Sequence, residues 1–169
     1  MMSEQLTMID KDYLLDINGK RVFRYKACGL DNIYLVEGYN LNDGGYSITA
    51  IDELHACIAI TLVTKKQNLT GKEFRFIRKE LKMSQKDLAE FANTDVQAVA
   101  RWEKGEVENG SVNLAERMIR MLYLARHNRV EEVEPLFKHL AELDAQCQKD
   151  WIFEEKESGW VFKESKKVA

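Results

Sequence analysis

Two polar side chains four residues apart, Gln97 and Arg101, are well suited to reading the hydrogen-bonding pattern of another molecule. Residues four apart lie on the same face of an α-helix. A glutamine amide can pair with two neighbouring atoms on the edge of adenine, and an arginine guanidinium with O6 and N7 of guanine. Val96 and Ala98 beside them are small enough to let a helix enter a DNA groove. The spacing of Gln97 and Arg101 therefore predicts hydrogen bonding to base edges.

The helix that carries this pair is predicted from its capping residue and its apolar spacing. Asp95 offers a side-chain acceptor for the first N–H groups of a helix, and Val99 and Trp102 take its inward positions. Ser84 caps the preceding helix in the same way, with a carboxylate three residues further on. Asn93 stands in the turn between the two helices, where a residue able to enter the left-handed region is needed.

Two short helices joined by a tight turn are the layout of a DNA-reading helix-turn-helix. Gln85, beside Lys86, is placed to bond a phosphate through its side chain and its backbone N–H together. The start of the second helix is where such a motif meets base edges. The residues expected to contact DNA are Ser84, Gln85, Lys86, Thr94, Val96, Gln97, Ala98 and Arg101.

Further helices are predicted on both sides of this pair. Thr70 and Glu73 form a capping-box pattern, and Phe74, Ile77 and Leu81 recur at helical spacing after it. The remaining faces of that helix carry basic residues, namely Lys72, Arg75, Arg78, Lys79 and Lys82. After the pair, a fourth helix is predicted from the apolar positions Leu114, Met118, Met121, Leu122 and Ala125.

The segment SQKDLAEFANTDVQAVARWEKG, from Ser84 to Gly105, resembles the helix-turn-helix of the lambda-repressor-like (XRE) regulators. Asn93 stands where that family usually has glycine, and Thr94 where it usually has an aliphatic residue. The resemblance implies a five-helix DNA-binding domain whose later helices often dimerise. The residues that match the family pattern are Ser84, Gln85, Leu88, Ala89, Val99, Trp102, Glu103 and Gly105.

A narrower resemblance covers more of the chain. The stretches from Tyr25 to Val36 and from Leu69 to Arg75 look like the zinc-ribbon/helix-turn-helix regulators that include the MqsA-type antitoxins. Those proteins carry two N-terminal CxxC pairs, and here only Cys28 stands at a comparable place. The metal is therefore not carried over, and we expect neither a metal site nor a cofactor.

The N-terminal part predicts strands followed by one helix. Residues 13–17 and 20–26 read as a β-hairpin, because the intervening Asn-Gly pair suits a two-residue turn. Residues 33–36 and 46–48 predict two further strands, and residues 51–64 a helix that is apolar nearly all round. That helix is expected either to pack on the N-terminal sheet or to form a dimer interface.

The C-terminal part predicts one more helix and a hairpin. Residues 131–148 have an apolar stripe at helical spacing, and residues 150–154 and 160–163 read as two strands with an aromatic face. That face is expected to be core, with a partner surface as the alternative. The predicted class is α+β in three regions: a β-rich dimerisation or partner domain (1–66), the helix-turn-helix domain (67–128) and a C-terminal helix with a hairpin (129–169). The polar run from Lys65 to Asn68 is the candidate linker.

Charge is distributed unevenly along the 169 residues. The chain has a net charge of −3, but residues 65–105 carry 10 basic and 6 acidic side chains, net +4. Residues 1–64 have a net charge of −4 and residues 106–169 of −3. A positive middle flanked by acidic ends directs attraction for phosphate onto one segment.

The remaining composition indicates a cytoplasmic protein. No apolar run has the length of a membrane span, and the N-terminus lacks the pattern of a signal peptide. The three cysteines, Cys28, Cys57 and Cys147, are far apart and form no CxxC, as expected of free thiols in a reducing compartment.

Two functions follow from these observations. The first is a sequence-specific transcriptional repressor that binds double-stranded DNA as a homodimer on a palindromic operator. The second is an antitoxin that masks a toxin protein and autoregulates its operon. An enzyme is not expected, because the sequence has no nucleophile–base pair, no phosphate-binding glycine loop and no convergent carboxylates.

Overall fold

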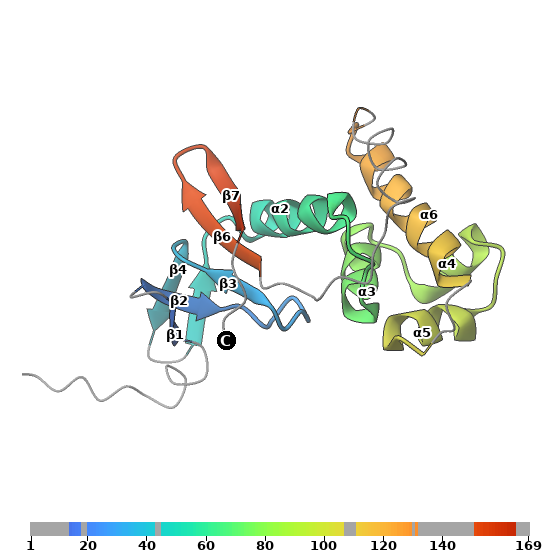
Figure 1. Cartoon of the computed structure of the whole chain (residues 1–169), viewed down its shortest axis with the longest axis horizontal. Coiled ribbons are helices and arrows are strands. Elements are labelled where there is room, and N and C mark those ends of the chain that lie inside the picture. Colours follow the sequence, from blue (N-terminus) through green and yellow to red (C-terminus); the bar gives the residue numbers. More distant parts are fainter. Residues whose placement is uncertain are drawn as a thin grey trace, which may run out of the picture. The chain divides into compact units, whose positions relative to one another are not determined.

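The computed structural model describes residues 14–17, 20–42, 45–106, 111–129, 131 and 151–164. The chain divides into two compact units, residues 1–57 with 149–169 and residues 58–148. Helices and strands both contribute, so the α+β class predicted from the sequence is confirmed (Figure 1).

The first unit is built on a five-stranded sheet with the order β1-β2-β3-β6-β7. Figure 1 shows the blue strands of the N-terminal part beside the red strands of the C-terminal part. The strands are β1 (Leu14–Ile17), β2 (Lys20–Arg24), β3 (Ile33–Leu35), β6 (Trp151–Lys156) and β7 (Gly159–Glu164).

Two antiparallel hairpins join through one parallel pair in this sheet. Ile17 pairs with Lys20, as the predicted first hairpin requires, and residues 18 and 19 between them lie outside the described residues. β3 pairs with β6 in parallel, with the Trp151 N–H donating to the Asn32 carbonyl at 2.8 Å. The predicted C-terminal hairpin therefore completes the N-terminal sheet.

A second, two-stranded sheet pairs β4 (Tyr39–Asn42) with β5 (Gly45–Ile48). The sequence predicted the strand at 46–48 but not β4. The Phe23 ring, which is fully buried, lies 5.0 Å from the ring of Tyr39 and 4.7 Å from that of Tyr46. The packing of these two rings on Phe23 stabilises β4 in its position. This contact lies between strands, so the alternation pattern within any one strand does not predict it.

The aromatic face of the β6–β7 hairpin is largely core. Phe153 is fully buried and Trp151 is nearly so. The Phe162 ring lies 5.2 Å from that of Trp151 and 5.8 Å from that of Phe153. Phe162 itself retains 36% of its surface exposed.

Helix α2 (Ile51–Thr64) has the bounds that the sequence predicted. Its residues Leu54, Ile58 and Leu62 are buried within a single chain, and so are Ala59 and Val63. Most of its apolar surface is thus covered without a second copy. In its first half, His55 Nε2 and the Tyr25 hydroxyl form a hydrogen bond of 2.9 Å, so this histidine packs as a satisfied polar residue.

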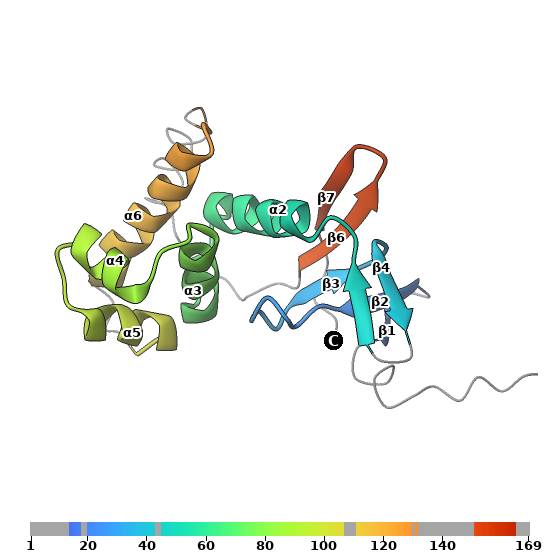
Figure 2. The same ribbon diagram turned by 180° about the vertical axis from the view of Figure 1, so that it is seen from behind.

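After α2, the described residues of the second unit form four helices: α3 (Gly71–Glu80), α4 (Gln85–Phe91), α5 (Val96–Lys104) and α6 (Ser111–Arg126). In both Figure 1 and Figure 2, α4 and α5 lie side by side. The capping box of Thr70 and Glu73 is present at the start of α3. The helix predicted at 131–148 falls outside the described residues, apart from Glu131.

A buried cluster of four charged side chains fixes the connection between α2 and α3. Lys65 donates to both carboxylate oxygens of Glu73 at 2.8 and 2.7 Å. Arg120 donates to Glu116 Oε1 at 2.6 and 3.1 Å. All four residues are at most 7% exposed. This burial lowers the pKa of Lys65, and the carboxylate of Glu73 opposes that shift.

Arg120 also closes the C-terminal end of α2. Its guanidinium donates to the carbonyl oxygens of Leu62, Val63, Lys65 and Gln67 at distances of 2.7 to 3.2 Å. The last carbonyls of a helix have no partner within the helix, and a cation there also opposes the helix dipole. The polar run proposed from the sequence as a linker is therefore held by a side chain of α6.

We expect the substitution Arg120→Met to lower the free energy of unfolding by about 3–5 kcal/mol, because it leaves Glu116 buried without its cation. Urea denaturation measures this loss. The matched control is Arg117→Met in the same helix, at a half-exposed position, with an expected cost below about 1 kcal/mol. Equal costs for the two variants would contradict a structural role for the cluster.

Candidate nucleic-acid interface

Helices α4 and α5 begin and end at the residues that their caps dictate. The Ser84 N–H donates to Asp87 Oδ2 at 2.7 Å, and the Asp87 N–H donates to Ser84 Oγ at 3.1 Å. Asp95 Oδ1 accepts the Ala98 N–H at 2.7 Å and starts α5. Asn93 in the turn has a φ of 49°, the left-handed conformation that the sequence predicted there.

The N-terminus of α3 approaches the C-terminus of α5 so closely that Gly71 is required. A Cβ atom on Gly71 would lie 2.5 Å from the Glu103 carbonyl oxygen and 2.8 Å from the Gly105 nitrogen. Gly105 ends α5 with a φ of 73°, and its N–H bonds back to carbonyls of the last turn. The Phe74 and Trp102 rings pack edge to face at 5.9 Å beside this contact. The backbone of α5 is thereby held against α3.

A buried carboxylate joins all three helices. Glu103 on α5 accepts a short hydrogen bond from Arg78 Nε on α3 and a 2.9 Å hydrogen bond from Gln85 Nε2 on α4. Arg78 Nη1 also donates to the Met83 carbonyl at 2.6 Å, before α4 begins. Side chains of Arg78 and Glu103 are only 9% and 5% exposed. This ion pair fixes where α4 and α5 stand relative to α3.

Arg78 does not lie with the other basic residues on the remaining faces of its helix, so the prediction from the sequence was wrong for this residue. Arg78 follows Phe74 by four residues and precedes Leu81 by three, which is the spacing of the buried stripe. Glu103 likewise follows the buried Val99 by four residues. An arginine and a glutamate therefore each stand at a position whose helical spacing predicts burial. Their opposite charges could have predicted the buried ion pair between Arg78 and Glu103.

The residues expected to contact DNA lie along one surface of α4 and α5. Gln97 and Arg101 are exposed on the face of α5 opposite the buried Val99 and Glu103, and Val96 is exposed at the first turn of the helix. Ala98 and Thr94 are half-buried beside them, and Ser84 and Lys86 are exposed at the start of α4. Gln85 is half-buried, because its amide is used to donate to Glu103.

Exposed basic side chains are present on α3, α4 and α5. Lys104 is exposed on α5, and Lys86 lies 3.8 Å from Glu90 in an exposed pair worth little energy. Arg75 on α3 is 59% exposed, and its Nε lies 3.9 Å from the Glu103 carboxylate. Neither Arg75 nor Lys104 was among the DNA contacts predicted from the sequence.

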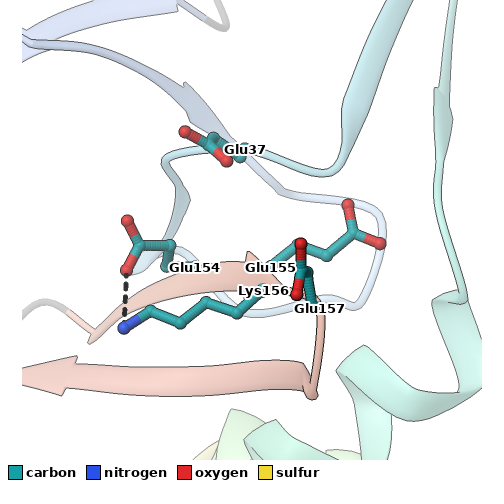
Figure 3. A pocket seen from close by; sticks show the side chains of 5 residues that line it. All are labelled: Glu37, Glu154, Glu155, Lys156 and Glu157. Atoms are coloured by element: carbon teal, nitrogen blue, oxygen red, sulfur yellow. Dashed lines mark ion pairs between the residues drawn. The ribbon is translucent and has the colours of Figure 1, made fainter.

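The first unit has a hollow of opposite character. Figure 3 shows Glu37, Glu154, Glu155, Lys156 and Glu157 lining it, with an ion pair between Lys156 and Glu154. Lys163 also donates to Glu154 and keeps the pKa of this carboxyl below its usual range. A lining of four carboxylates repels phosphate, so this hollow does not suit a nucleic acid.

Side chains of types that can bind metal ions also occur in the described part of the chain. No group of three His, Cys, Asp or Glu side chains there is arranged to hold a metal ion. Burial raises the pKa of the Cys57 thiol, which disfavours its reactive thiolate form. None of the described helices is both long and apolar enough to span a membrane.

We expect Arg78→Met to lower the free energy of unfolding by about 3–5 kcal/mol, since it leaves the buried carboxylate of Glu103 without its main cation. The control Arg75→Met removes an exposed guanidinium from near the same carboxylate and should cost less than about 1 kcal/mol.

The double variant Arg78→Met/Glu103→Leu should recover most of this loss, because apolar residues can replace a buried ion pair at little cost. Chemical denaturation compares the three variants. A loss as small for Arg78→Met as for Arg75→Met would show that the buried pair does not hold the helices.

The cap of α4 predicts a pH dependence. The pKa of Asp87 is lowered, first by the backbone N–H of Ser84 and then by its side chain. Ionised Asp87 therefore stabilises the folded state at neutral pH. That contribution is lost as the pH falls through the folded-state pKa, below the ordinary value of about 3.9. Carboxyl NMR titration should give a midpoint below that of the unfolded chain, and an equal midpoint would contradict the cap.

Comparison with known proteins agrees with this geometry. Residues 74–117 match the family model described as helix-turn-helix, which spans α3, α4, α5 and the start of α6. No curated protein and no solved structure matches the chain. The resemblance to XRE regulators is thus supported over this segment, and the match supports a DNA-binding transcription regulator.

Proposed function

We propose that the protein is a sequence-specific transcriptional repressor that binds a palindromic operator as a homodimer. The observation that supports this most is the exposed face of α5, which presents Gln97 and Arg101 from a helix whose backbone is held by buried contacts. Preorganisation matters, because side chains that read bases must be presented in a fixed register.

In this proposal α5 enters the major groove. Arg101 donates to O6 and N7 of a guanine, Gln97 pairs with an adenine, and Val96 contacts a thymine methyl group. Ser84 and Lys86 at the start of α4 hold a phosphate of the flanking strand, and Thr94 and Ala98 lie at the margin of the contact. The amide of Gln85 bonds Glu103, so Gln85 contributes mainly by orienting the start of α4.

A homodimer with two-fold symmetry presents two copies of α5. The two half-sites of the operator would then be centred about 34–36 Å apart, or one turn of DNA. Selection from random-sequence duplex DNA identifies the operator, and a palindromic consensus with this spacing is expected. A consensus without two-fold symmetry would contradict the homodimer.

We expect Arg101→Ala to weaken binding to the selected operator by about 1–3 kcal/mol and to relax the preference at one base pair in each half-site. The control is Lys86→Ala, which should weaken binding to all sequences alike and reduce the slope of log K against log salt by about 1. Both side chains are exposed, so the melting temperature should not change.

Titration of each variant against the operator and its single-base substitutions measures these effects. Unchanged affinity and unchanged base preference in Arg101→Ala would contradict the role of Arg101. The antitoxin alternative is tested by purifying the tagged protein from its host. A stoichiometric small basic protein bound to it would favour that alternative.

A further inference from the structure

Strand β7 forms one edge of the five-stranded sheet, since β6 is the strand that pairs with it among the described residues. The backbone groups of Trp151 and Phe153 in β6 are used toward β3, through Trp151 N–H to Asn32 O and Val36 N–H to Phe153 O. Backbone groups point to alternate sides along a strand, so the N–H and C=O groups of the residues between and after these two point toward β7. These residues are Ile152, Glu154 and Lys156, and their partners in β7 are Lys163, Val161 and Gly159. It follows that Trp160 and Phe162 point their N–H and C=O groups away from β6, toward the open edge.

This edge carries exposed apolar side chains as well as backbone groups. Val161 is 37% exposed and Phe162 is 36% exposed, and both belong to the small set of large apolar residues that are exposed in the described chain. An edge strand of this kind is a template for pairing with another strand.

The edge is complementary to a second copy of itself. In an antiparallel pair centred on Val161, Trp160 lies opposite Phe162 of the second copy, and their outward backbone groups exchange hydrogen bonds on both sides of the two-fold axis. Val161 lies opposite Val161, so the same register pairs aromatic with aromatic and β-branched with β-branched residues, which are favourable cross-strand pairs.

Charge fits the same register. Lys163 lies opposite Gly159 of the second copy, a residue with no side chain of its own. The Glu53 carboxylate sits at that place, 3.4 Å from the position that a Cβ of Gly159 would take. Lys163 already bonds Glu154 of its own chain, so this register brings no uncompensated like charge opposite another at either end of the paired strands.

We propose that β7 pairs antiparallel with β7 of a second copy and that this pairing is the homodimer interface. The proposal rests on the repressor function only for its biological role, since the pairing itself can be measured without DNA.

Crosslinking tests the register. Val161→Cys places two cysteines opposite each other in a non-hydrogen-bonded pair, where Cα atoms are about 4.5 Å apart and within disulfide range. We expect a disulfide-linked dimer on mild oxidation of the full-length chain. Glu157→Cys, at the exposed hairpin tip, and the unaltered chain with its own cysteines should remain largely uncrosslinked.

Introducing a charge at the centre of the contact tests the interface in solution. Val161→Lys places like charges opposite each other and should raise the dimer dissociation constant about tenfold or more, whereas Val161→Thr should leave it nearly unchanged. Analytical ultracentrifugation of the unaltered chain and both variants measures this. A dimer that is unaffected by Val161→Lys and not crosslinked by Val161→Cys, or an unaltered chain that stays monomeric, would overturn the proposal.

Binding to a single half-site separates this proposal from the repressor function. If both hold, Val161→Lys binds one half-site with the base preference of the unaltered chain but loses the added affinity of the full palindrome. If the unaltered chain selects no DNA sequence and Val161→Lys still dissociates the dimer, the interface stands and the repressor function fails.

Discussion

The exposed face of α5, which we propose contacts DNA, depends on one buried ion pair, between Arg78 of α3 and Glu103 of α5. Helices α4 and α5 are short, with 7 and 9 residues, and helices of that length are not stable alone in water. Their positions must come from tertiary contacts. Glu103 supplies them by accepting from Arg78 and from Gln85, so that a single carboxylate relates three helices.

Buried ion pairs also hold a second part of this unit, the connection between α2 and α3. Two ion pairs are buried there and hydrogen-bonded, where apolar side chains would be usual. They are Arg120 with Glu116 of α6, and Lys65 with Glu73. A buried charge costs stability unless its hydrogen bonds are met, and here the guanidinium of Arg120 meets four backbone carbonyls besides a carboxylate. Such a network favours one arrangement of the chain between α2 and α3, because any other arrangement would leave these charges unpaired.

Local signals were enough to predict the elements of the helix-turn-helix. Ser84, Asp95 and Asn93 each act through neighbours within three residues, so their roles could be inferred from the sequence alone. The bounds of α2 were also predicted from a local pattern, the apolar residues at helical spacing between positions 51 and 64. The parallel pairing of β3 with β6 joins residues more than 100 positions apart, and no local pattern specifies it. The burial of Arg78 was missed because a basic residue was assumed to lie at the surface, although its spacing placed it in the core.

Methylation interference on the selected operator is a direct test of whether α5 reads bases from the major groove. Dimethyl sulfate methylates guanine at N7 in the major groove and adenine at N3 in the minor groove. Methylation of the guanine that pairs with Arg101 should abolish binding in each half-site, whereas methylation of adenine N3 at the neighbouring A·T base pairs should have little effect. Interference from adenine N3 alone would place the contact in the minor groove and contradict the account.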